Sequence, residues 1–132
     1  MRAKAIFVSV ILLMLWVLPA VSLAEEKKMD KPEMKTYYLV FLLKGANRNQ
    51  DSTEAAKIQE AHLAHLTKLS KVGKLVMAGP LLDDMDLRGI CVYDVKTLEE
   101  AKALAEADPA VKSGRLKVEV HPWMSQRGAK LP

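Results

Sequence analysis

Two histidines on one predicted helix are the strongest chemical signal in the sequence. Placed at 100° per residue, the helix that ends before Gly73 has an apolar stripe, and His62 and His65 both fall inside it. Imidazole titrates near neutral pH, so either ring could serve as a general acid or base. The simpler alternative is that each ring packs at the margin of the core, with one nitrogen bonded to backbone or solvent. The apolar members of the stripe are Ile58, Leu66, Leu69 and Val72.

Asp108 is the carboxylate that could orient such a histidine. It follows the second predicted helix, where the helix dipole disfavours a negative charge. A neighbouring carboxylate would hold one tautomer of an imidazole and stabilise its charged form. The alternative is purely local: Asp followed by Pro109 is typical of a helix start, with the aspartate as N-cap and proline at the first position. Both interpretations stay open from the sequence.

The remaining titratable residues give weaker signals, and no metal site is predicted. Asp83, Asp84 and Asp86 could offer oxygen ligands to a divalent cation, but they lack the spacing of a calcium loop. His62 and His65 could share a metal, but no third ligand is close in sequence. The sequence has no phosphate-binding loop, dinucleotide fingerprint or nucleophile elbow. We therefore expect no cofactor.

Cys91 is the only cysteine, so the chain cannot form an intramolecular disulfide. Its neighbours Ile90 and Val92 are apolar, which favours a buried and unreactive thiol over a reactive one. The fold must therefore be stabilised by its core.

The elements that must position these residues follow from hydrophobic patterning. Runs of β-branched, aromatic and aliphatic residues predict strands over residues 36–43, 74–78, 89–95 and 116–120. One helix is predicted from cap candidates at residues 51–54 to Val72, and a second, with a Thr97–Glu100 capping box, from Leu98 to Ala107. This βαββαβ order predicts an α+β, ferredoxin-like fold, with a four-stranded antiparallel sheet and two helices on one face.

The same patterning indicates the order of the strands and a partner. The first and third strands are apolar on both faces, as central strands are, whereas the fourth alternates like an edge strand. Two helices cover only one face of such a sheet. Because no residues remain to cover the other face, a second copy of the chain is the simplest cover, and the sequence predicts a homodimer.

The N-terminus is typical of a secretory signal peptide. Arg2 and Lys4 precede an apolar stretch over residues 5–18, and small residues at Ser22 and Ala24 suit a cleavage site after Ala24. An uncleaved anchor is the alternative, but the apolar run falls short of the roughly 20 residues that a span needs. We expect a periplasmic or secreted protein.

The rest of the chain is long enough for one domain. We divide the chain into a signal peptide (1–24), a flexible linker (25–35), a single domain (36–123) and a C-terminal tail (124–132). Signal removal would lower the formal net charge from +4 to +2, with basic residues scattered along the chain. We therefore expect no nucleic-acid partner, and no membrane partner after cleavage.

Several short motifs together resemble the YCII-related (YciI-like) domain family. They are Ala61-His62-Leu63, the segment 73–80 (GKLVMAGP), the acidic loop ending at Gly89, Ala107-Asp108-Pro109, and Val120-His121-Pro122-Trp123. The resemblance covers residues 36–123. It implies a ferredoxin-like fold that assembles as a dimeric α/β barrel, with a histidine–aspartate active centre at His62 and Asp108. His65 falls at a variable position of the family and ranks second, as a substrate-binding residue.

The resemblance and the residues together favour a small-molecule enzyme. In this hypothesis His62 exchanges a proton with a small, cyclic or aromatic substrate, Asp108 orients the ring, and Gly79 and Pro80 shape the pocket wall. The reaction would be an elimination, isomerisation or hydrolysis without a cofactor. The alternative is a non-catalytic dimeric module that binds a small ligand. The sequence departs from the family at Ala110, where an aromatic often follows Asp-Pro, and in its export signal.

Overall fold

The computed structural model of the chain describes residues 31–132. The predicted signal peptide and the first part of the predicted linker lie outside these residues. The described elements, in chain order, are β1 (Met34–Lys44), α1 (Ser52–Lys71), β2 (Leu75–Pro80), β3 (Leu87–Tyr93), α2 (Leu98–Glu106), α3 (Pro109–Lys112) and β4 (Leu116–Gln126). None of the helices in this part of the chain has the length and apolar character needed to cross a membrane.

The four strands form one antiparallel sheet in the order β2-β3-β1-β4. The predicted ferredoxin-like fold is therefore confirmed, as are the central positions of β1 and β3 and the edge position of β4. In the register, Val40 pairs with Cys91 on one side and with Val120 on the other. Because neighbouring strands run antiparallel, the last residues of β1 and β2 lie at the same end of the sheet as the first residues of β3 and β4.

Local capping fixes where the two long helices begin. The backbone N–H of Glu54 donates to Asp51 at 2.8 Å, and that of Glu100 donates to Thr97 at 3.1 Å. Each of these side chains satisfies a helix N–H that has no partner within the helix. After α1 the chain turns at Gly73, whose φ of 75° is readily adopted only by glycine. Both predicted helices are confirmed to within a residue or two.

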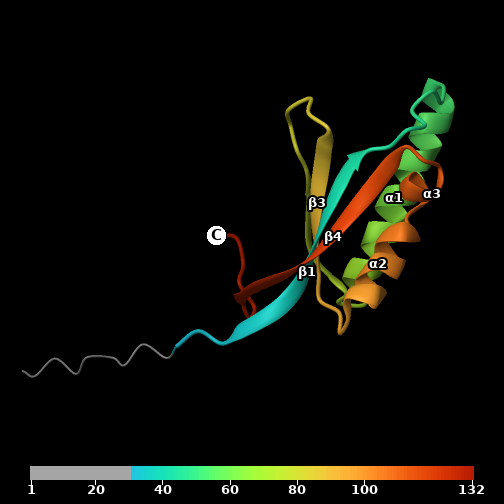
Figure 1. Cartoon of the computed structure of the whole chain (residues 1–132). Coiled ribbons are helices and arrows are strands. Elements are labelled where there is room, and N and C mark those ends of the chain that lie inside the picture. The colour runs from blue at the N-terminus through green and yellow to red at the C-terminus, as the bar shows by residue number, and fades with distance from the viewer. Residues whose placement is uncertain (1–30) are drawn as a thin grey trace, which may run out of the picture. The chain divides into compact units, whose positions relative to one another are not determined.

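β1 and β4 are longer than their patterns predicted. Residues 123–126 of β4 pair with residues 34–37 of β1, although the sequence predicted a strand ending at residue 120 and a tail from 124. Pro122, which follows the predicted strand, pairs with Tyr38 within the longer strand. An edge strand tolerates proline because its outward N–H groups need no partner strand. Figure 1 shows this end of the two strands reaching beyond the rest of the sheet.

The helices all lie on one face of the sheet (Figure 1), so the sheet has one covered and one uncovered face. On the covered face, Tyr38, Val40 and Leu42 are buried against the helices. On the opposite face, Leu39, Phe41 and Leu43 are only partly buried. No helix among residues 31–132 covers that face. The rest of the core consists of Leu69, Leu75, Cys91, Tyr93, Ala101 and Ala105.

Candidate functional site

His62 and Asp108 lie in direct contact in the layer between the helices and the sheet. His62 is the buried imidazole of α1, and Asp108 precedes α3. Their Nδ1 and Oδ2 atoms are 2.6 Å apart, and the two residues are only 7% and 2% exposed. The contact joins residues 46 positions apart in the chain, so packing of α3 beside α1 must create it. The two interpretations of Asp108, partner of a histidine and N-cap, are both realised.

The hydrogen bonds of Asp108 assign the tautomer of His62. One carboxylate oxygen accepts the backbone N–H of Ala110 at 2.9 Å, and the other accepts Nδ1–H of His62. Because a carboxylate only accepts, the proton of the neutral ring stands on Nδ1. This leaves Nε2 with a free lone pair. Nε2 makes no hydrogen bond within residues 31–132, and it is not a buried atom without a partner, so it is open to the cavity beside it.

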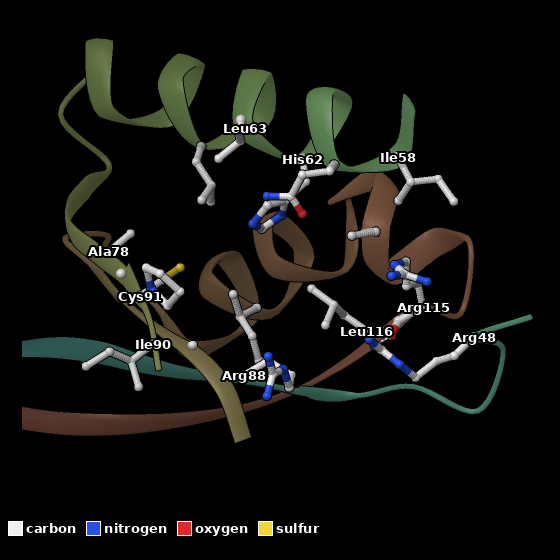
Figure 2. Close-up of a pocket in the computed structure, with 17 residues that line it drawn as sticks. Arg48, Ile58, His62, Leu63, Ala78, Arg88, Ile90, Cys91, Arg115 and Leu116 are labelled. Atoms are coloured by element: carbon white, nitrogen blue, oxygen red, sulfur yellow. Dashed lines mark hydrogen bonds between the residues drawn. The ribbon is translucent and has the colours of Figure 1, made fainter. Parts of the chain in front are cut away.

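The cavity measures about 410 Å³ and lies between α1 and the sheet edge where β1 and β2 end. Figure 2 shows the ring of His62 pointing into it from α1. Gly79 and Pro80, predicted as wall residues, do line it at the end of β2. A cavity of this size holds a one-ring organic molecule. Most of the wall is apolar, with contributions from Leu42, Ile58, Leu63, Leu66, Ala78, Gly89, Ile90, Cys91, Ala110 and Leu116.

His65 is placed elsewhere. Its Nε2–H donates to the backbone carbonyl of Leu104 in α2 at 3.0 Å, and the ring is not among the residues lining the cavity. Three residues along a helix turn the side chain by about 60° from His62, so both can lie on one broad stripe yet contact different neighbours. The placement gives His65 the packed role that was the simpler alternative for both histidines. It does not support the predicted contact with substrate.

Three arginines share the cavity, and the sequence interpretation missed them. Arg48 comes from the loop after β1, Arg88 from the start of β3, and Arg115 from the turn before β4. In Figure 2 their guanidinium groups stand toward one end of the cavity, away from Cys91 and Ala78. The predicted antiparallel strand order could have identified them, because it places these three strand ends at one end of the sheet.

The arginines are close enough to affect one another. The pKa of Arg48 is lowered by partial desolvation and by the charges of Arg115 and Arg88, while Asp84 acts in the opposite sense. Arg88 and Lys44 both pair with Asp84, at 3.5 and 3.2 Å. The hydrogen bond from Lys44 lowers the pKa of that carboxyl. Asp84 of the acidic loop is therefore paired with two cationic side chains. Residues 31–132 contain no cluster of three metal-ligating side chains.

Near the His62–Asp108 pair, burial keeps the thiol of Cys91 and the phenol of Tyr93 neutral. Cys91 is fully buried, and desolvation, reinforced by the charge of Asp108, raises its pKa to about 12. The pKa of Tyr93 is also raised, mainly by desolvation and further by Cys91 and Asp108. The predicted buried thiol is confirmed. Charges in such a weakly polar environment interact more strongly than they would in water.

Comparison with known proteins agrees with this architecture. Residues 38–124 match the family model of the YCII-related domain. Among solved structures, the chain is similar to the 5-chloro-2-hydroxyhydroquinone dehydrochlorinase of Burkholderia phenoliruptrix in complex with 2,5-dihydroxybenzoquinone, with 26% identity and a TM-score of 0.50. The match covers 66% of this chain and 92% of the dehydrochlorinase. No curated protein sequence matches significantly. The matched segment is more than half of the chain and contains the helices, the cavity-lining residues and most of each strand, so the chain belongs to the YCII-related domain family.

Proposed function

We propose that this protein is a small-molecule enzyme that uses His62 as a general base. The observation that carries the proposal is the geometry of one residue: Nδ1 of His62 is held by Asp108 at 2.6 Å, while Nε2 faces a cavity of about 410 Å³. A general base must present a free lone pair within reach of the substrate proton. The similarity to a dehydrochlorinase supports this activity class.

The chemical step follows from that tautomer. Nε2 of His62 takes a proton from a ring hydroxyl or an activated C–H of the substrate, and the electron pair of the broken bond moves into the ring. In an elimination, the leaving group departs with the electron pair of its own bond to carbon. The resulting imidazolium is stabilised by the Asp108 carboxylate and then returns its proton to solvent or product. Neither metal nor cofactor takes part in this sequence.

The substrate class that fits best is a halogenated, hydroxylated six-membered ring. The similar dehydrochlorinase acts on such a ring, and its solved complex holds 2,5-dihydroxybenzoquinone. The mostly apolar wall suits the ring, while the few polar groups can orient its oxygens. Elimination of halide is therefore the first reaction to test, with isomerisation and hydrolysis as the other acid–base reactions that the site could perform.

The experiment is turnover by the mature protein with chlorinated hydroxyhydroquinones, followed by halide release and by the absorbance of the quinone product. We expect His62→Ala to lower kcat by at least about 100-fold, the usual contribution of general-base catalysis. His65→Ala is the matched control, because it removes a histidine from the same helix without touching the cavity. Equal activity of wild type and His62→Ala would refute the mechanism.

A binding module is the alternative, and the same material distinguishes it. If the wild type and His62→Ala bind 2,5-dihydroxybenzoquinone equally and neither converts any chlorinated ring, the cavity stores or senses a ligand. Thermal stabilisation by the ligand measures this binding directly.

We also propose that the enzyme is exported and dimeric. Export rests on the charged start, apolar run and small-residue cleavage site of residues 1–24. N-terminal sequencing of protein from the periplasm or medium should begin at Glu25. Dimerisation is supported by the uncovered face of the sheet, where Leu39, Phe41 and Leu43 form an apolar row on a central strand. Sedimentation at micromolar concentration tests it.

A further inference from the structure

One end of the cavity carries more positive charge than the protein itself neutralises. Arg48, Arg88 and Arg115 all line it, and Asp84 is the acidic side chain that pairs with one of them. Within residues 31–132, neither Arg48 nor Arg115 has a carboxylate within 4.0 Å. Bringing three guanidinium groups together costs electrostatic free energy unless an anion offsets it.

The protein uses only part of the hydrogen-bonding capacity of these arginines. Nη1 of Arg48 donates to the backbone carbonyl of Arg115 at 2.8 Å, and Nη1 of Arg115 donates to the side chain of Gln50 at 3.0 Å. These contacts leave most of the five N–H donors of each guanidinium unused. Each side chain is also tied to the segment that the other comes from. These two hydrogen bonds restrict where the unused donors can point.

The approach of the two loops is built into the backbone. The N–H of Gly45 donates to the carbonyl of Arg115 at 2.9 Å, and that of Asn47 donates to the carbonyl of Gly114 at 3.0 Å. A Cβ atom at Gly45 would overlap the carbonyl oxygen of Gly114, so only glycine permits this approach. The loop carrying Arg48 and the turn carrying Arg115 are therefore held together before any ligand arrives.

We infer that the arginine end of the cavity is an anion subsite that binds a negative charge shared by two oxygens on a ring-shaped substrate. The anion is a ring carboxylate or the vinylogous carboxylate of an acidic hydroxyquinone, and in both the charge is shared by two oxygens in one conjugated plane. The fork of one guanidinium matches a carboxylate with paired N–H donors, and two separate arginines can each bind one of the more widely spaced oxygens of a hydroxyquinone. Bound there, the ring extends along the apolar wall toward Nε2 of His62. The inference about substrate class rests on the proposed function, but the binding itself does not require catalysis.

The test compares probes that differ only in charge, in the mature protein and in His62→Ala. Gentisate carries a ring carboxylate, and gentisamide replaces it by a neutral amide of nearly the same shape. We expect gentisate to bind about 10-fold more tightly than gentisamide near neutral pH, because a charge-assisted hydrogen bond contributes about this much. The advantage should shrink at high salt, since the cavity mouth is open to screening.

Two arginine variants assign the effect to the subsite. Arg48→Gln and Arg115→Gln should each weaken gentisate binding about 5- to 10-fold and leave gentisamide unchanged. Arg127→Gln is the matched control, because it removes the same charge from an exposed side chain that pairs with Glu33 outside the cavity. Arg48→Lys keeps the charge without the fork and should restore only part of the affinity. Thermal melting confirms that each variant is folded.

The outcomes separate the inference from the proposed function. If gentisate binds more tightly than both gentisamide and 2,5-dihydroxybenzoquinone, the anion is a carboxylate substituent. If 2,5-dihydroxybenzoquinone binds more tightly than both gentisate and gentisamide, the anion is formed by the ring's own oxygens. Either result supports the subsite. The subsite is refuted if gentisate and 2,5-dihydroxybenzoquinone both bind no more tightly than gentisamide. It is also refuted if Arg48→Gln and Arg127→Gln change the affinity for gentisate equally. Loss of the preference in His62→Ala would contradict the arginine assignment. Absence of turnover with the preference intact would refute only the enzyme.

Discussion

Asp108 has two hydrogen-bonding roles that one substitution can separate. One oxygen caps α3 through the N–H of Ala110, and the other accepts Nδ1–H of His62. Asparagine caps helices about as well as aspartate, and its carbonyl oxygen can replace the capping oxygen. Its amide nitrogen would then face His62 as a donor. We therefore expect Asp108→Asn to shift the proton of His62 from Nδ1 to Nε2, so that the ring presents a donor to the cavity in place of a lone pair.

The expected magnitudes differ sharply between activity and stability. Without a lone pair on Nε2, the general-base contribution is lost, and kcat should fall about 100- to 10,000-fold. The cap and one hydrogen bond to His62 both persist, so the free energy of unfolding should change by less than about 1 kcal/mol. Asp108→Ala loses the cap and leaves the buried N–H of His62 without a partner. Together these should lower the free energy of unfolding by about 2–4 kcal/mol.

Long-range proton–nitrogen NMR of the His62 ring tests the tautomer without any substrate, and urea denaturation gives the free energy of unfolding. Asp51→Asn is the matched control, because Asp51 caps α1 through the N–H of Glu54 in the same way but contacts no histidine. Both asparagine variants should melt close to the wild type. Only the change at Asp108 should move the ring proton and lower kcat.

Two results would refute this reasoning. If Asp108→Asn retains the ring proton on Nδ1, the carboxylate does not determine the tautomer. If it is destabilised as strongly as Asp108→Ala, capping accounts for the whole role of the residue.

The remaining predictions concern Cys91, the uncovered face of the sheet and Gly45. Because the pKa of Cys91 is raised from 9.0 to about 12, iodoacetamide should label the native thiol at about pH 8 roughly 1,000-fold more slowly than the urea-unfolded thiol. Fast labelling of the native thiol would contradict its burial. Because the unfolded thiol ionises at a lower pH than the folded one, the free energy of unfolding should fall as the pH rises from 9.0 toward 12. Leu39→Glu on the uncovered sheet face should convert a dimer to monomers in sedimentation, whereas Leu82→Glu, on a 98% exposed loop residue, should not. Gly45→Ala should lower the free energy of unfolding by about 1–3 kcal/mol in urea titrations, while Gly79→Ala, which meets no atom within 4 Å, should not.

Sequence patterns predicted the parts of this protein that depend on local rules. The Thr97 cap, the Gly73 stop and the central position of β1 each follow from residue type and period, and each is observed. The end of β4 does not, because the predicted alternation ends at Val120, whereas the strand continues through Pro122, which an edge strand tolerates. Local rules could not place strand ends that depend on sheet position.

In the candidate site, too, the residues in local motifs were predicted and those brought together by the sheet were not. His62 and Asp108 stand in motifs that resemble a family, and their contact was expected from that resemblance. The arginines stand far apart in the chain, at positions 48, 88 and 115, with no common motif. Only the strand register brings them together. The helical stripe was too broad to separate His62 from His65, since a stripe covers both the cavity and the contact with α2.

The His62–Asp108 pair and the three arginines are held by different kinds of structure. The His62–Asp108 pair is buried, joined by α1 and the cap of α3, and surrounded by neutral groups. The arginines come from a loop, a strand start and a turn at one end of the cavity. Loops tolerate substitution better than packed helices do. If the arginines bind an anion as proposed, substitutions among them should therefore change which anion is bound without moving the His62–Asp108 pair.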